Sequence, residues 1–109
     1  MGRAKSALKS QEEMIKRARR FVEKASKILR VREAYIVGSR ARGDYLSDSD
    51  IDIVLVAEGV RDLSAKERAE ILSDVAEPNV EYIVYDATEW DSDASVWIRK
   101  LKEEAMRIA

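Results

Sequence analysis

Apolar residues recur every three or four positions through the first third of the chain, which is typical of an amphipathic helix. The recurring positions are Met14, Ile15, Ala18, Phe21, Val22, Ala25, Ile28 and Leu29. Ser10 and Glu13 precede them with the spacing of a capping box, so this spacing predicts a helix that begins there and runs for about five turns. We expect the helix to cover one face of a sheet, with residues 1–9 as a flexible or loosely helical extension.

Three short apolar runs rich in β-branched residues predict strands over residues 34–37, 51–56 and 80–85. Between and after these strands we expect a short helix over 39–44, a helix over 64–76, a loop over 86–93 and a closing helix over 94–108. The helix over 64–76 opens with a Ser64/Glu67 capping box and ends before Pro78. The order αβαβαβα predicts an α/β (α+β) fold, with a small mixed β-sheet covered by helices. Residues 1–109 are expected to form a single domain.

The closing helix is expected to place Trp97, Ile98, Leu101, Ala105 and Ile108 on one face, toward the core. The aromatic residues of this half of the chain could also stack on a nucleobase. They are Tyr82, Tyr85, Trp90 and Trp97. Their helical or strand spacing favours the core.

Composition limits the chemistry that the chain can perform. It has no cysteine and no histidine, so disulfides and thiolate or imidazole metal sites are excluded and a metal ion must be held by oxygen. No apolar run approaches the ~20 residues needed to span a bilayer, and no signal peptide is visible. We therefore expect a cytoplasmic protein that does not bind membranes.

The net charge of −1 conceals an uneven distribution. Residues 1–30 carry ten Lys or Arg against three Glu, whereas residues 31–109 carry ten against eighteen acidic residues. The basic helix is either a solvated face or a contact for an acidic partner. The acidic remainder disfavours binding of nucleic acid.

Asp50 and Asp52 are the chain's clearest candidates for chemistry. They stand two residues apart at the start of the strand over 51–56, so both side chains project from the same face. Adjacent carboxylates repel each other unless a cation lies between them, and Mg²⁺ prefers such oxygen ligands. Gly38 and Ser39 lie just upstream at a strand-to-helix turn, where backbone N–H groups can bind phosphate. The stretch therefore predicts a metal site beside an anion-binding turn.

Gly38-Ser39, ten intervening residues, and then Asp50-Ile51-Asp52 resemble the signature of the DNA polymerase beta-type nucleotidyltransferase superfamily. The strings GSRARG and SDSDIDIVLV are most similar to its MNT-type, or minimal, nucleotidyltransferases, many of which are paired with HEPN proteins in prokaryotic toxin–antitoxin systems. The resemblance implies two Mg²⁺ ions, or Mn²⁺ in their place, held by Asp50, Asp52 and a third acidic residue on a following strand.

Glu81 matches that third position, as a carboxylate within the apolar run VEYIVY. Asp86 is the competing candidate, but it has the opposite strand parity and is expected in a loop. The resemblance also assigns nucleotide contacts to Gly38, Ser39 and Arg42, with Ser49 capping or supporting the site. Arg40 is expected to be a surface charge as readily as a ligand, and Asp48 a turn residue.

These assignments imply an enzyme of the nucleotidyltransferase class that moves AMP from ATP to a hydroxyl acceptor. By resemblance, the acceptor could be a tyrosine of a HEPN-type toxin, and the protein would then act as an antitoxin. The alternative is a binding module that neutralises its partner by stoichiometric contact and retains a vestigial nucleotide site. Domains of this size often bury an apolar patch by dimerising, so a homodimer is a further expectation.

Overall fold

The computed structural model describes residues 2–109, with side chains from residue 7 onward. Its sheet has four strands in the spatial order β3–β2–β1–β4. Their bounds are Arg30–Val37 for β1, Ile51–Glu58 for β2, Val80–Asp86 for β3 and Met106–Arg107 for β4. Strand β1 runs antiparallel to both β2 and β4, whereas β2 and β3 are parallel. The predicted mixed sheet of an α/β fold is therefore confirmed.

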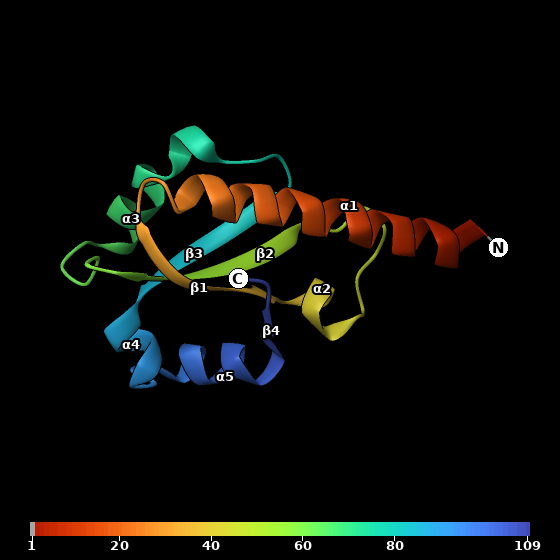
Figure 1. The fold of residues 1–109 in the computed structure, drawn as a ribbon. Helices are drawn as coiled ribbons and strands as arrows, with labels where there is room; N and C mark the ends of the chain where they lie inside the picture. Colours follow the sequence, from red (N-terminus) through yellow and green to blue (C-terminus); the bar gives the residue numbers. More distant parts are fainter. Residues whose placement is uncertain (1) are drawn as a thin grey trace.

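Helices cover both faces of this sheet, giving three layers (Figure 1). They are α1 (Gly2–Ala25), α2 (Ser39–Arg42), α3 (Ala65–Ile71), the 3-10 turn η1 (Ser73–Val75), α4 (Ala87–Asp91) and α5 (Val96–Glu104). Helices α1 and α3 lie on one face, and α4 and α5 lie on the other. In the described part of the chain, no helix combines the length and apolar character needed to cross a membrane.

The alternation of side chains along β2 explains its continuous apolar run. Ile51, Ile53 and Leu55 pack into the core under α1, whereas Val54 and Val56 pack against α4 and α5. Because both faces of β2 are covered, apolar residues are favoured at nearly every position of this strand. Asp52 and the terminal Glu58 are the polar residues of β2, and Asp52 points to the α4–α5 face by the same alternation.

The N-terminal predictions need two corrections. Helix α1 includes residues 2–9 and continues through Ser10, so Ser10 and Glu13 do not form a capping box. The hydroxyl of Ser10 instead donates a hydrogen bond to the carbonyl of Ser47, 2.5 Å away. The helix also ends at Ala25 rather than near Leu29, because residues 26–29 form a turn that connects α1 to β1. Met1 lies outside the described residues.

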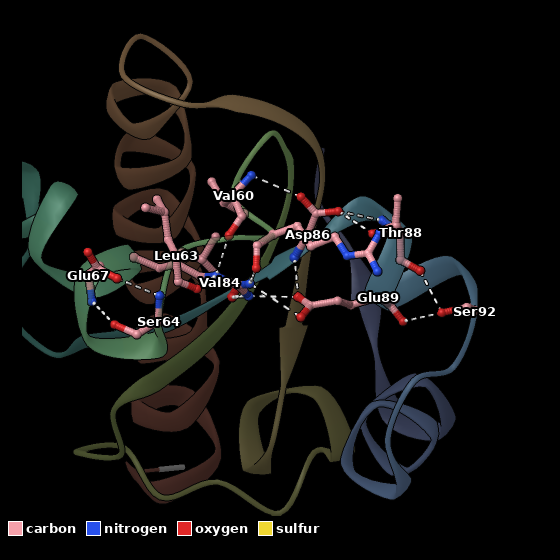
Figure 2. Close-up of polar contacts among 11 residues, drawn as sticks. Val60, Leu63, Ser64, Glu67, Val84, Asp86, Thr88, Glu89 and Ser92 are labelled. Carbon is pink, nitrogen blue, oxygen red and sulfur yellow. Dashed lines mark hydrogen bonds and ion pairs between the residues drawn. The ribbon is translucent and has the colours of Figure 1, made fainter.

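The C-terminal predictions were wrong in two places. The predicted loop over 86–93 contains helix α4, which Asp86 and Glu89 open with a capping box (Figure 2). The closing helix ends at Glu104, after which Met106 and Arg107 pair with β1 as strand β4. This pairing satisfies backbone groups that the edge of β1 would otherwise expose. The Ser64/Glu67 capping box of α3 is confirmed.

The two tryptophans have opposite environments. Trp90 is buried at 3% exposure and stacks on Tyr35, with ring centroids 5.3 Å apart. Trp97 is 68% exposed, so its predicted place on the inward face of the closing helix was wrong. Ile98, the next residue along α5, is buried instead. A helix of nine residues that covers only a small core needs few inward positions.

Candidate active site

The register of β2 against β3 brings two of the predicted carboxylates together. Asp52 and Glu81 are directly paired across these parallel strands, and Asp50 immediately precedes β2. Asp86 pairs with Ala57 at the far end of the strands, and its side chain caps α4. Asp86 and Glu81 therefore point to opposite faces of β3, as predicted. Asp86 is the last residue of β3, however, and does not lie in a loop.

Burial and neighbouring negative charge act together on Asp52. Burial raises the pKa of Asp52 above its usual range, and Glu81 raises it further through its charge and a hydrogen bond. Asp50 and Glu104 raise the same pKa by charge alone. Such a group of carboxylates is stabilised by a cation, and its donor atoms are the hard oxygens that Mg²⁺ prefers. The donor set thus fits a divalent ion.

Asp50 is exposed, and its Oδ1 accepts a hydrogen bond from Nδ2 of Asn79, 3.0 Å away. Asn79 has a positive φ of 65°, a conformation that asparagine adopts more readily than most residues. Its carbonyl also accepts from the backbone N–H of Ile51 at 2.9 Å. Across residues 2–109, no three acidic side chains converge closely enough to form a complete cation site. Movement of side chains must therefore accompany cation binding by all three carboxylates.

Gly38 forms the wall of the site beside Asp52. Its φ is 74°, and a Cβ atom built there would lie 2.6 Å from Oδ2 of Asp52. A side chain at Gly38 would therefore collide with the carboxylate of Asp52. Ser39 follows as the first residue of α2, half-buried.

Arg42 lies on α2 and is engaged by two carboxylates. Its Nη1 is 2.7 Å from Oε2 of Glu104, and its Nε is 3.3 Å from Oδ2 of Asp44. Glu104, the last residue of α5, was not predicted to belong to the site, and no local motif marks it. Asn79 was also missed, although its place after Pro78 and before an apolar run is typical of a turn residue.

Ser49 supports the turn that precedes the site, whereas Arg40 departs from one of its two expected roles. The Oγ of Ser49 accepts from the backbone N–H of Leu46, so this hydroxyl closes the turn ahead of Asp50. Arg40 was expected to be a surface charge as readily as a ligand, and its exposure of 2% excludes the surface charge. Its guanidinium turns inward because acceptors on α1 and on the loop surround it. Asp48 is an exposed residue of the same loop.

A cavity of about 350 Å³ opens beside these groups. Its walls are Val37, Gly38, Asp52, Ile53, Glu81, Tyr82, Ile83, Leu101 and Glu104. Glu104 also lines a neighbouring cavity of about 600 Å³ that includes Arg42 and Lys100. A third cavity of about 360 Å³, lined in part by Tyr35, Trp90 and Lys102, includes none of the predicted site residues. Because Glu104 lines the first two cavities, Arg42 and the carboxylates of Asp52 and Glu81 border adjoining spaces.

Comparison with known proteins agrees with this geometry. Residues 15–105 match the model of the nucleotidyltransferase domain family. Among solved structures, the chain is similar to a protein from Sulfolobus solfataricus that is provisionally assigned as a nucleotidyltransferase. The two are 41% identical, with a TM-score of 0.80, over 98% of this chain and 89% of that one. No curated protein matches the chain.

Proposed function

The chain belongs to the nucleotidyltransferase domain family, and we propose that it transfers AMP from ATP to a hydroxyl group of a partner protein. The observation that carries this proposal is the pairing of Asp52 with Glu81 on adjacent strands, with Asp50 two residues before Asp52. The proposed acceptor is a tyrosine of a HEPN-type toxin, which the protein would neutralise as an antitoxin by covalent modification.

Asp50 and Asp52, with Glu81, are the residues that would hold Mg²⁺ or Mn²⁺. Bound there, the ions would neutralise phosphate charge and lower the pKa of the attacking hydroxyl. In the proposed reaction the acceptor oxygen bonds to the α-phosphorus of ATP, the bond from that phosphorus to the bridging oxygen breaks, and pyrophosphate leaves. The Glu81 carboxylate, which lies on β3 opposite Asp52 of β2, is the proposed acceptor of the hydroxyl proton.

Arg42 is the proposed contact for the terminal phosphates, because a guanidinium forms forked, charge-assisted hydrogen bonds with them. Gly38 and Ser39 would lie beside the same phosphates at the start of α2. The carboxylates of Asp50, Asp52, Glu81 and Glu104 surround the site with negative charge. That charge favours a small triphosphate, which binds together with cations, as the ligand and disfavours a long nucleic acid.

The first test is calorimetric titration of ATP into the protein with and without Mg²⁺. The variant Asp50→Asn/Asp52→Asn should lose the Mg²⁺-dependent binding while remaining folded. Asp62→Asn/Asp74→Asn is a matched control, because it removes the same charge from two exposed positions away from the site. Equal Mg²⁺-dependent binding by both double variants would overturn the site assignment.

The second test is label transfer from α-labelled ATP to a HEPN-type partner. We expect transfer with the wild-type protein and with the Asp62/Asp74 control, and none with the Asp50/Asp52 variant. A stable complex that forms without ATP or Mg²⁺, and is unaffected by the Asp50/Asp52 variant, would instead support neutralisation by stoichiometric contact.

A further inference from the structure

Arg40 is a buried cation at the centre of a hydrogen-bond network next to the proposed site. Its Nη2 and Nε donate to the carbonyl of Ser49 at 2.6 and 3.2 Å. The guanidinium also donates to Oε1 of Gln11 at 3.1 Å and to Oγ of Ser10 at 3.0 Å. Tyr45 lies against it, with 4.6 Å from the guanidinium carbon to the ring centroid. The acceptors are neutral oxygens, so the network is directional rather than an ion pair.

The network joins α1, α2 and the loop that leads to Asp50. Gln11 contacts Arg40 twice, because its Nε2 also donates to the carbonyl of Arg40 at 3.0 Å. Ser10 accepts from the guanidinium and donates to the carbonyl of Ser47. Two consecutive residues of α1 therefore hold both the short helix α2 and the turn over residues 46–49.

We propose that Arg40 is a positioning residue that fixes the direction of the chain at Asp50. Arg40 makes its two shortest contacts with the loop at the carbonyl of Ser49. The peptide bond of this carbonyl joins Ser49 to Asp50. That peptide unit is planar, so holding its oxygen also holds the start of Asp50. Asn79 donates a second restraint, a hydrogen bond to the carboxylate of Asp50. The inference rests on the proposed function, since it assigns Asp50 to a cation.

Arg68 provides an internal comparison for the effect of burial alone. It is 7% exposed and donates to the carbonyls of Val60, Leu63 and Val84 at 3.0 to 3.1 Å, and to Glu89 at 2.8 Å. These partners lie around the start of α4, the region drawn in Figure 2. Both arginines hold elements together through main-chain oxygens. Of the two, Arg40 is the one that contacts the segment leading into Asp50.

The test compares Arg40→Gln with Arg68→Gln. Binding of Mn²⁺ alone is measured by titration at a temperature where both variants are folded, and amide hydrogen exchange is measured over residues 44–50. We expect Arg40→Gln to weaken Mn²⁺ binding by about tenfold or more, the usual effect of removing a residue that orients a metal ligand. Exchange over residues 44–50 should rise in the same variant. Arg68→Gln should lower the melting temperature but leave Mn²⁺ affinity and exchange over 44–50 unchanged.

Gln11→Ala keeps the test decisive if Arg40→Gln does not fold. It removes two contacts of the network while leaving the guanidinium in place, so we expect a smaller change of both measurements in the same direction. Equal Mn²⁺ affinity in the Arg40 and Arg68 variants, or equal exchange over 44–50, would overturn the role of Arg40. A wild-type protein that binds no Mn²⁺ would instead overturn the proposed function, and the exchange measurement would still decide whether Arg40 holds the loop.

Discussion

Arg42 and Glu104 form an ion pair of 2.7 Å between α2 and the end of α5, so the arginine assigned to a triphosphate already holds an anion. A phosphate oxygen has to replace that carboxylate before it can bind Arg42. We therefore expect Glu104→Gln to tighten the binding of inorganic tripolyphosphate, titrated without metal ions. The gain should be about two- to fivefold, the strength of an ion pair in contact with solvent.

Glu103→Gln is the matched control, because Glu103 lines the same cavity as Arg42 and Glu104 and is exposed. It removes the same formal charge one residue away. Equal tightening in the two variants would mean that general charge, rather than the contact with Arg42, limits binding. In an Arg42→Gln background, the benefit of Glu104→Gln should disappear.

Gly38 should tolerate no side chain without damage to the site. The new Cβ of Gly38→Ala would lie 2.6 Å from Oδ2 of Asp52, and the φ of 74° would strain the backbone. We expect a folded protein, destabilised by about 1–3 kcal/mol, whose Mg²⁺-dependent ATP binding is lost. Gly59→Ala has a similar φ of 80° but no atom within 4 Å of its Cβ, so it should lose stability and keep ATP binding. Similar ATP affinities in the two variants would contradict the steric argument.

The contact between Asn79 and Asp50 should matter for the ligand more than for the fold. Asn79→Gly keeps a residue that accepts the φ of 65° and removes the hydrogen bond to Asp50. We expect its melting temperature to stay near that of the wild type while Mn²⁺ affinity falls by about tenfold. A large loss of stability with unchanged Mn²⁺ affinity would assign Asn79 to the fold instead.

Asp86 should give the protein part of its stability at neutral pH. It is 3% exposed, and it accepts from the N–H groups of Val60 at 3.0 Å and Thr88 at 2.9 Å. The hydroxyl of Thr88 lowers the pKa of Asp86, and burial opposes this. Because the folded pKa lies below the unfolded value of about 3.9, the stabilisation is present above that pH and is lost as pH falls through the folded pKa.

We expect Asp86→Asn to reduce the free energy of unfolding at neutral pH by about 1–3 kcal/mol. Urea denaturation at pH values between about 7 and about 3 should show the difference from wild type shrinking toward acid. Asp62→Asn, at an exposed position, should differ little from wild type throughout. A difference for Asp86→Asn that stays constant down to acid pH would show that the lowered pKa of Asp86 contributes little.

Strand parity made much of the site's arrangement predictable. Alternation places Asp52 on the same face of β2 as Val54 and Val56, and the same rule separates Glu81 from Asp86 on β3. These relationships depend only on alternation and on the order of elements. The mixed sheet followed from the same kind of pattern, because apolar runs at this spacing have few arrangements that bury them.

The missed contacts join residues that are distant in sequence. Arg40 meets Gln11 across 29 positions, and Arg42 meets Glu104 across 62. No local pattern encodes such a meeting, since it depends on how α1 and α5 lie on the sheet. The capping box predicted from Ser10 and Glu13 was wrong for a related reason. The same spacing also occurs inside a helix, and here the Ser10 hydroxyl donates a hydrogen bond to the loop residue Ser47.

The same limit applies to the two tryptophans, whose positions in the chain do not reveal which one is buried. Trp90 packs against Tyr35 and Tyr85 and is 3% exposed, whereas Trp97 is 68% exposed. We expect Trp90→Ala to cost about 3–5 kcal/mol of unfolding free energy, and Trp97→Ala to change it by about 0.5 kcal/mol or less. Because these are the chain's two tryptophans, Trp97→Phe should leave a blue-shifted fluorescence spectrum from Trp90, and Trp90→Phe a red-shifted one from Trp97. Comparable losses of stability in the two alanine variants would mean that Trp97 is covered in solution, as a homodimer through α5 would require, and sedimentation analysis of the wild type would then decide.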